Sequence, residues 1–214
     1  MEDPAEASRA LGRTCATTEL DVRSVEGVNA WIGAMGRIDV LVNNAGGGFH
    51  AHFDTINDKG QKALVDENFT SVTACIRASL SHFEQGGSII NVTTVEAFRA
   101  SPGFSIYGAM KAGVEHLSRS LALELSPLGI RVNTIAPDGM DTEGEAGLMN
   151  DAGASNAYRE QLALGAGDAD DAVGPAIFLA SAASRYVTGT TIHVDGGSDA
   201  ARGWRKRPDG TWFP

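Results

Sequence analysis

The chain has 214 residues and a formal net charge of -10 at neutral pH. This acidic balance argues against a nucleic-acid-binding surface, and no apolar run approaches the roughly 20 residues that a membrane span needs. The 43% hydrophobic and 21% charged residues are typical of a globular protein with a sizeable core.

Cysteine content and the first residues bear on location. Cys15 and Cys75 are too few for a disulfide framework and lack zinc-type spacing, so we expect free thiols in a reducing compartment. The spacing of His50-x-His52 with Asp54 fixes no third metal ligand, so we expect a loop there and no metal site. The opening segment MEDPAEASRALG has no hydrophobic block and is not a secretory signal. The expected location is the cytoplasm.

The first part of the chain alternates helices and strands. Residues 4–11 have helical character, residues 15–22 indicate a strand, and residues 24–35 place apolar side chains at helical spacing. Residues 38–42 form the apolar run typical of a parallel strand covered on both faces. This run breaks into Asn43-Asn44-Ala45-Gly46-Gly47-Gly48, whose small residues let a ligand approach the main chain.

The alternation continues to the end of the chain. The expected elements are helix 57–85, strand 88–94, helix 104–125, strand 130–137, helix 168–183 and strand 190–197. Such a pattern predicts an α/β fold with one parallel sheet and helices on both faces. Ligands of these sheets bind outside the carboxyl ends of the strands, where Asn43–Gly48, Thr93–Thr94 and Pro137–Thr142 lie. We therefore expect three strand ends to converge on one site.

Tyr107 and Lys111 lie one turn apart on predicted helix 104–125. Because side chains four residues apart share a helix face, the ammonium can sit beside the phenol and favour the phenolate. A phenol whose pKa is lowered in this way can act as an acid or base near neutral pH. The Tyr-x-x-x-Lys pattern is common on helices, so its meaning depends on the residues around it.

Residues 21–197 resemble the short-chain dehydrogenase/reductase family. The motifs that carry the resemblance are Asp21-Val22, Asn43-Asn44-Ala45-Gly46, Asn68, Thr94, Tyr107-x-x-x-Lys111, Asn133 with Ile135-Ala136-Pro137, Thr142, Val187-Thr188-Gly189 and Val194-Asp195-Gly196-Gly197. The 13-residue step from Thr94 to Tyr107 fits the family's serine-to-tyrosine spacing. The resemblance implies a Rossmann-like sheet in a single domain over residues 1–214, with residues 198–214 as a tail.

The resemblance also implies roles for the residues of the site. Tyr107 is expected to exchange a proton with the substrate oxygen, Lys111 to lower the pKa of Tyr107, and Thr94 to replace the serine that hydrogen-bonds that oxygen. Asn68 is expected to bind a water that links the lysine to solvent, in a helix locally opened at that point. The residues expected to line the groove that holds the cofactor in relatives are Asn43, Ala45, Gly46 and Pro137.

The chain departs from the family pattern in three ways. Relatives open with a strand, a Thr-Gly-x-x-x-Gly-x-Gly turn, a helix and a second strand, and Met1 falls where a relative would be leaving that second strand. The turn holds the pyrophosphate of NAD(P), so we expect the first β-α-β unit and the main anion site to be absent. Thr94 adds a methyl group that narrows the pocket. Asp138 replaces a glycine and adds a negative charge that discourages an anionic dinucleotide.

This absence would leave strand 15–22 without a neighbour, because its counterpart in the family pairs only with the second strand. We predict that residues 15–22 instead pair with strand 38–43, in the place of the family's first strand. A bare edge at residues 38–43 would favour aggregation or an oligomer partner.

Three functional hypotheses follow. The favoured one is an enzyme that uses Tyr107 for acid–base chemistry without NAD(P), by elimination, isomerisation, ring opening or hydrolysis of a small to medium carbonyl or hydroxyl compound. The alternatives are an NAD(P)-dependent oxidoreductase with a reduced or partner-completed cofactor site, and a non-catalytic subunit. The family resemblance implies a homodimer or homotetramer formed through helices 57–85 and 104–125.

Candidates for the substrate pocket lie near the strand ends. Glu96 is either a second base or a solvated loop acid, and Asp138 has the same two interpretations. The basic and aromatic tail, residues 198–214, covers a pocket, packs on a partner subunit or frays. The expected lining of the pocket is Phe53, Phe98, Phe104, Met140, Thr142 and Leu148.

Overall fold

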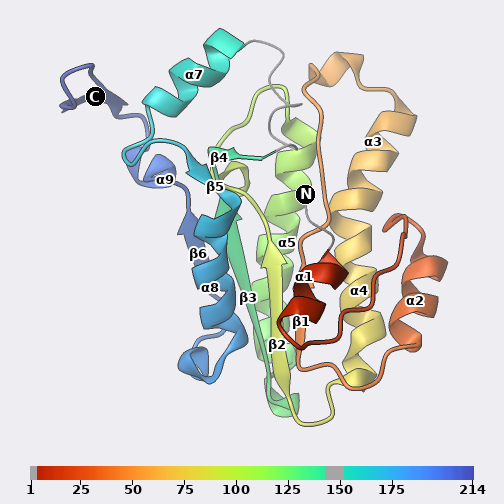
Figure 1. Ribbon diagram of the computed structural model, residues 1–214. Coiled ribbons are helices and arrows are strands. Elements are labelled where there is room, and N and C mark those ends of the chain that lie inside the picture. Colours follow the sequence, from red (N-terminus) through yellow and green to blue (C-terminus); the bar gives the residue numbers. More distant parts are fainter. Residues whose placement is uncertain (1–3, 143–151) are drawn as a thin grey trace.

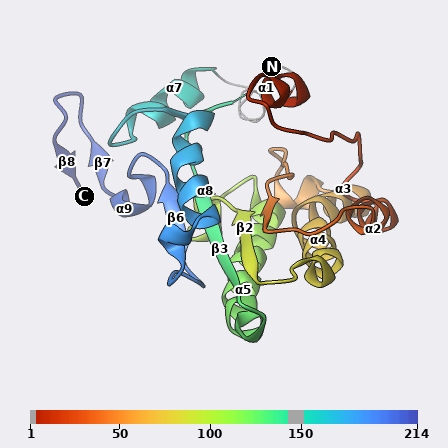
Figure 2. The same ribbon diagram turned by 60° about the horizontal axis from the view of Figure 1, so that its bottom comes forward.

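A parallel sheet of four strands forms the centre of the molecule, in the order β1-β2-β3-β6 (Figure 1). The computed structural model describes residues 4–142 and 152–214. The strands of the sheet are β1 (Val40–Asn43), β2 (Gly87–Val92), β3 (Ile130–Pro137) and β6 (Thr191–Val194). Helices lie on both faces, with α4 and α5 on one side and α8 on the other (Figure 2). The predicted Rossmann-like α/β fold is confirmed.

The helices follow the predicted pattern in most of the chain, whereas the four minor strands were not predicted. The α-helices are α1 (Pro4–Ala10), α2 (Val25–Gly33), α3 (Asp58–Val65), α4 (Ser71–Ser79), α5 (Ser105–Glu124), α7 (Ala152–Glu160), α8 (Val173–Ala180) and α9 (Ser198–Ala201). Two small sheets join β4 (Met140–Asp141) to β5 (Gly167–Asp168), and β7 (Arg205–Lys206) to β8 (Trp212–Phe213). Single 3₁₀ turns occupy Phe53–Thr55, Leu80–His82, Val95–Ala97, Ser126–Leu128, Ala169–Ala172 and Ala182–Ser184.

Side chains of the central strands alternate between the two faces of the sheet. Ile89 and Val132 pack in the core under α4 and α5, whereas the neighbouring Ile90 and Ile135 pack against Leu179 of α8. Each of these residues is almost completely buried. This two-sided burial explains why strands β2 and β3 have nearly continuous apolar sequences.

The predicted pairing of residues 15–22 with β1 is wrong. Residues 13–21 run as an irregular segment, and within the described residues β1 pairs with β2 alone. The reason is that Leu20 packs against the α2 residues Val28 and Ile32, so the segment stays with its own helix. Val42 of β1 is consequently 49% exposed, beside a groove of about 230 Å³.

Candidate active site

The carboxyl ends of β1, β2 and β3 meet beside the N-terminal half of α5. Below this point a chain of buried amides joins the elements, because Asn43 donates to Asn91 (2.7 Å) and Asn91 donates to Ser118 of α5 (2.8 Å). Glu115 of α5 lies deeper and accepts hydrogen bonds from threonines on three strands or strand ends. These contacts fix α5 relative to the sheet and therefore fix the residues that α5 presents at the strand ends.

Lys111 projects from α5 into the buried space at the end of β2. Its side chain is nearly inaccessible, and Nζ donates one hydrogen bond to the carbonyl oxygen of Val92 (3.0 Å). Burial lowers the pKa of Lys111 to about 8, although the charge of Glu67 acts in the opposite direction. An ammonium carries three N–H donors, so two remain for a ligand.

Tyr107 lies one turn before Lys111, with the lysine Nζ 5.7 Å from the centroid of its ring. Burial raises the pKa of Tyr107 to about 12; a hydrogen bond with Thr94 lowers it, and the charges of Glu96 and Asp138 raise it further. The expected lowering of this pKa by Lys111 is not found. In the structure burial outweighs every favourable contact, and the phenol is protonated at neutral pH.

Asn68 sits in a π-helical turn, Asp66–Thr70, that interrupts the predicted helix 57–85 between α3 and α4. Its fully buried amide donates to the carbonyl oxygens of Gly47 (2.8 Å) and Leu64 (2.9 Å) and accepts from the N–H of Gly47 (3.2 Å). This turn is the local opening of the helix that the family resemblance implies. The water-binding role of Asn68 stays a prediction, whereas the contacts shown fasten the glycine loop after β1.

That loop, residues 43–48, lies directly over Tyr107 and Lys111. A Cβ atom at Gly46 would lie 2.9 Å from Oδ1 of Asn68 and 3.0 Å from Nζ of Lys111, and one at Gly48 would lie 3.3 Å from the Tyr107 ring. The close approach explains why glycines follow Ala45. The absence of side chains at these glycines also leaves main chain accessible beside the phenol, as a ligand at the strand ends requires.

Asp138 follows β3 and is held by residues that the sequence did not single out. Arg99 donates from Nη2 to Asp138 Oδ2 (3.1 Å), to Glu96 Oε1 (2.8 Å) and to the Tyr158 hydroxyl (2.6 Å), and from Nη1 to Ser198 (2.6 Å). The hydroxyl of Tyr158 donates to the same Asp138 oxygen. We call these five residues the Arg99 cluster. Glu96 and Asp138 are therefore paired acids, neither a free base nor a bare charge at the strand end.

The local sequence contains little that predicts the Arg99 cluster. The i,i+3 spacing of Glu96 and Arg99 was the available signal, but Tyr158 lies in a long segment with weak patterning. Burial acts to lower the pKa of Arg99, yet the hydrogen bonds with Glu96 and Tyr158 and the charge of Asp138 raise it overall. Burial, followed by the charge of Asp138, raises the pKa of Tyr158 to about 12.

Other expected pocket residues are scattered. Phe104 packs edge-on against the rings of Tyr107 and His50, and Phe98 packs against the ring of His193. Pro137 ends β3, Met140 is buried in β4, and Thr142 is exposed beyond it. Phe53 is 68% exposed, so the structure does not bring it into the pocket. Leu148 lies outside the described residues.

Similar proteins show the family to which this chain belongs. A family model described as enoyl-(acyl carrier protein) reductase matches residues 2–199. The chain is 38% identical over 194 residues to 3beta-hydroxysteroid dehydrogenase 1 of Eggerthella lenta, covering 87% of this chain and 74% of that one. The chain belongs to the short-chain dehydrogenase/reductase family. This membership confirms the predicted family and the prediction of an enzyme.

Solved structures of short-chain dehydrogenase/reductases agree with this fold. A gluconate 5-dehydrogenase from Burkholderia cenocepacia, in complex with NADP and tartrate, superposes with a TM-score of 0.85 at 34% identity, covering 92% of this chain and 80% of that one. Carveol dehydrogenase from Mycobacterium avium, in complex with NAD, gives a TM-score of 0.82 at 32% identity, covering 91% and 78%.

The expectation of cofactor-free catalysis is therefore wrong, together with the elimination, isomerisation, ring-opening and hydrolysis reactions built on it. The similar proteins are named as dehydrogenases, and two of their structures contain NADP or NAD. Part of the error has a physical reason in this chain. Asp138 was taken as an unpaired charge that repels a dinucleotide, but Arg99 offsets that charge.

In residues 4–142 and 152–214, no cluster of three or more His, Cys, Asp or Glu side chains is arranged to hold a metal ion. His50 and His52 lie edge to face, 6.0 Å apart between ring centroids. Within the same described ranges, no helix combines the length and the apolar character needed to cross a membrane.

Proposed function

We propose that this protein is an NAD(P)-dependent oxidoreductase that reduces a carbonyl group of a small molecule to a hydroxyl group. The observation that carries the proposal is the placement of Tyr107 within hydrogen-bonding reach of Thr94 and beside Lys111 at the ends of the parallel strands. The names and bound dinucleotides of similar proteins support the same reaction class.

Each residue has a separate task in this reaction. The bound dinucleotide supplies the hydride. Tyr107, protonated because its pKa is raised to about 12, gives its proton to the substrate oxygen. The Thr94 hydroxyl, already bonded to that phenol, holds the same oxygen. Lys111 keeps a positive charge near the developing phenolate, and its pKa near 8 lets it do so at and below neutral pH.

The residues present fit the nicotinamide end of the dinucleotide. Lys111 has two N–H donors free of protein partners in the contacts described above, which suits the hydroxyl groups of a ribose. The main chain at Gly46 is exposed and that at Gly47 and Gly48 is partly exposed, so a flat ring can approach this loop from the solvent side. The fit rests on donor chemistry and on close approach of the backbone.

We further propose that the diphosphate end lies toward the open edge of β1, where an element outside residues 1–214 or a partner chain would complete the site. The 214 residues contain no Thr-Gly-x-x-x-Gly-x-Gly segment, which in the family supplies backbone N–H groups to the pyrophosphate. The open edge of β1, with Val42 exposed beside a groove, is where a completing element would lie.

Three broader expectations stay proposals. Residues 1–214 form one domain, and the protein acts in the cytoplasm. A homodimer or homotetramer forms through α3–α4 and α5. The last receives support from Leu123 of α5 and the following Leu128, which expose 75% and 55% of their surface.

The test is a turnover assay. Oxidation of NADPH and NADH is followed by absorbance with a panel of aldehydes, ketones and keto acids. The proposal expects turnover with at least one carbonyl compound, and Tyr107→Phe should lower the rate by about 10²- to 10⁴-fold, the range of general acid–base catalysis. Tyr186→Phe, which changes a fully exposed phenol, serves as control. Equal rates in the Tyr107→Phe and wild-type proteins would contradict the proposal.

A further inference from the structure

A second cavity, of about 860 Å³, lies next to the proposed active site on the α9 side. Phe98 and Arg99 form one wall, four and five residues after Thr94. The other walls come from α7, α9 and the C-terminal hairpin β7–β8. The volume lies within the range of about 300–1,000 Å³ that is usual for small-molecule sites.

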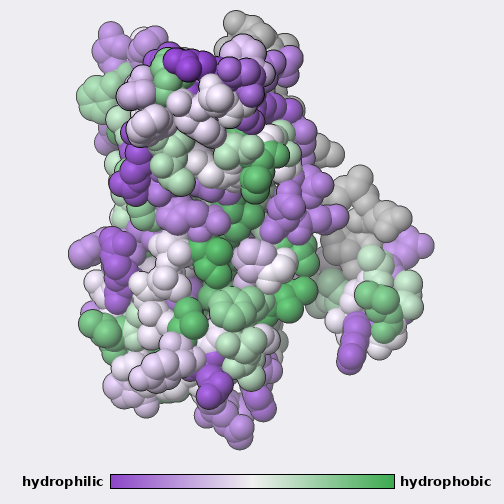
Figure 3. Space-filling view, turned by 90° about the vertical axis from the view of Figure 1, so that its left-hand side faces the viewer, coloured by the Kyte–Doolittle hydropathy of each residue, from purple (hydrophilic) through white to green (hydrophobic). Residues whose placement is uncertain are grey.

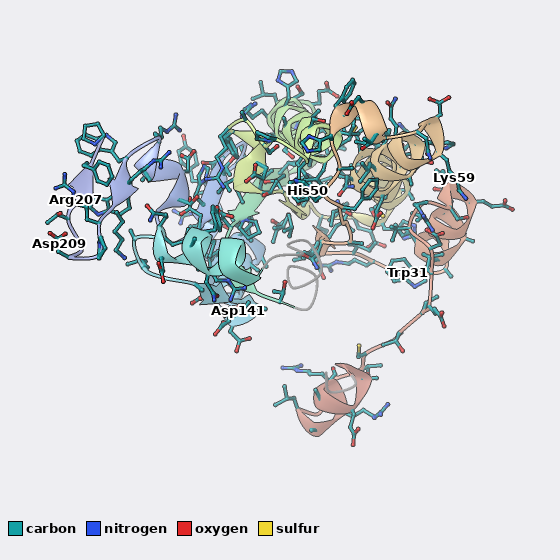
Figure 4. The ribbon with its side chains drawn as sticks, turned by 90° about the horizontal axis from the view of Figure 1, so that it is seen from above. Trp31, His50, Lys59, Asp141, Arg207 and Asp209 are labelled. Carbon is teal, nitrogen blue, oxygen red and sulfur yellow. The ribbon has the colours of Figure 1, made fainter. Side chains whose placement is uncertain are left out.

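The hairpin is docked against the rest of the molecule by specific contacts. The N–H of Lys206 donates to the side-chain oxygen of Gln161 (2.9 Å), and Nζ of Lys206 donates to the carbonyl oxygens of Leu162 (3.0 Å) and Ala163 (3.3 Å). Of the three possibilities raised for the tail, the one in which it covers a pocket matches this arrangement. Figure 4 shows the hairpin tip, with Arg207 and Asp209, at the outer end of the molecule.

The cavity wall carries more positive than negative charge. Arg99 is matched by Glu96 and Asp138, and Arg202 pairs with Asp199 (3.0 Å). Arg205 and Lys206 also line the cavity, and among the ion pairs of the described residues neither is matched by a carboxylate. Nζ of Lys206 uses two of its three N–H donors on carbonyl oxygens, which leaves one for a ligand.

This surplus is unusual in a chain whose formal net charge is -10. The hairpin end of the face seen in Figure 3 is mainly hydrophilic, whereas hydrophobic side chains gather over α8 in its centre. Cations left unmatched on an acidic protein favour an anionic ligand, because an anion can offset their charge and accept their hydrogen bonds.

Aromatic rings make up the apolar part of the same wall. Phe98, Tyr158, Trp204 and Phe213 all line the cavity, and Trp204 is 52% exposed although indole is costly to leave in water. Flat rings of this kind bury large apolar areas and stack on other flat groups. The cavity therefore combines a surface for a flat apolar body with two cations for an oxyanion.

We propose that this cavity binds the acidic end of the substrate, so that the substrate is an organic anion with a flat apolar body and a carboxylate or phosphate held by Arg205 and Lys206. This inference rests on the proposed function, because only an enzyme of that kind would use the bound anion as its substrate. The nearness of the two sites supports it, since Asp138 of the Arg99 cluster influences Tyr107 and bonds Tyr158 of the cavity wall. The carbonyl at the other end of the molecule then faces Tyr107.

The test is equilibrium binding to the full chain, without dinucleotide, by titration calorimetry. The ligands are 2-naphthoate, 2-naphthyl phosphate and the uncharged 2-naphthamide. The inference expects saturable binding of at least one anion. The amide should bind at least about tenfold more weakly than that anion, since a hydrogen bond to a charged group contributes about 1.5–3 kcal/mol. Whichever anion binds more tightly identifies the oxyanion as carboxylate or phosphate.

Two charge reversals locate the site. Arg205→Glu should weaken anion binding about tenfold or more, whereas Arg185→Glu makes the same change of charge at an exposed residue that does not line the cavity and should leave anion binding within about twofold. Equal effects of the two reversals, or equal binding of amide and anions, would overturn the inference.

Turnover separates this inference from the proposed function. With an acidic carbonyl substrate, Arg205→Glu should raise KM and leave kcat unchanged, since it removes a contact to the oxyanion and none to the carbonyl group that accepts the proton. Anion binding without any NAD(P)H oxidation would contradict the proposed function and leave the anion site intact. Turnover of neutral carbonyl compounds alone, without anion binding, would support the proposed function and overturn the anion site.

Discussion

Arg99 and Asp138 lie 39 residues apart in the chain and form an ion pair, Nη2 to Oδ2, at 3.1 Å beside the proposed active site. The pair brings the loop after β2 against the end of β3, and Tyr158 ties α7 to the same two side chains. An acid that looks unmatched in sequence is thereby made part of the support of the site. Under the proposed function, this contact offsets negative charge that would otherwise face the dinucleotide at the strand end.

Removing the guanidinium should therefore affect both binding and catalysis. In Arg99→Met, Glu96 and Asp138 become unmatched charges that repel the dinucleotide and raise the pKa of Tyr107 further. We expect NAD(P)H binding to weaken and kcat/KM to fall about tenfold, the effect of about 1.4 kcal/mol. Arg99→Met with Asp138→Asn should recover part of the loss, and a double variant no better than the single one would contradict the charge explanation.

We predict that catalysis requires the hydroxyl group of Thr94 but does not require its methyl group. Thr94→Val keeps the shape but removes the hydrogen bond that lowers the pKa of Tyr107 and holds the substrate oxygen. We expect kcat/KM to fall about 10- to 100-fold, corresponding to about 1.5–3 kcal/mol for a bond to a charged group. Thr94→Ser should remain within a few-fold of wild type. Steady-state kinetics of both variants decides, and similar losses in both would show that the methyl group is needed.

Stability should depend on pH through Lys111. Its pKa is about 8 in the folded protein against 10.5 in the unfolded chain, so between these values the unfolded state binds more protons. The free energy of unfolding contributed by Lys111 must therefore rise as pH increases from about 8 to about 10.5, by up to about 1.4 kcal/mol per pH unit.

Urea unfolding of wild type and Lys111→Met at a series of pH values measures this contribution. The difference in free energy of unfolding, wild type minus variant, should increase across that window. A difference that is constant with pH would mean that Lys111 keeps an ordinary pKa. Comparing the two proteins below pH 10 removes the effect of Tyr107, whose raised pKa lowers stability only at higher pH.

The glycine loop offers a matched pair of substitutions. In Gly46→Ala the new methyl group would meet Asn68 and Lys111 at about 3 Å, whereas Gly36→Ala has open space around it. We expect Gly46→Ala to destabilise the protein by about 1–3 kcal/mol, as overpacking does, and to weaken dinucleotide binding. Gly36→Ala should stay within about 0.5 kcal/mol of wild type. Thermal unfolding and NADPH titration of the pair would contradict this account if both variants behaved alike.

Local patterns were sufficient for most helices and strands, and the family resemblance pointed to the residues at the centre of the candidate site. Ser24 and Asn57 begin helices as N-caps, accepting from Gly27 (3.1 Å) and Gly60 (2.9 Å) respectively. The local opening of the helix at Asn68 was implied by the family resemblance, and this residue occupies a π-helical turn. Such features depend on neighbours in sequence, which a reader of the chain can see.

The errors arose where distant contacts decide. Residues 15–22 have strand-like composition, but the contact of Leu20 with α2 outweighs that preference. Asp138 looked unmatched because its partner Arg99 is far away in sequence. The pKa of Tyr107 was judged from Lys111 alone, whereas the burial that raises it comes from the whole fold.

Titration calorimetry of NADPH and NADH against the wild-type chain tests the central claim most directly, with Lys111→Met as the matched variant. We predict saturable binding of at least one dinucleotide, weakened about tenfold or more in Lys111→Met because the ammonium donates to the ribose. No saturable binding of either dinucleotide to folded wild-type protein at millimolar concentration, or equal binding to both proteins, would contradict the account.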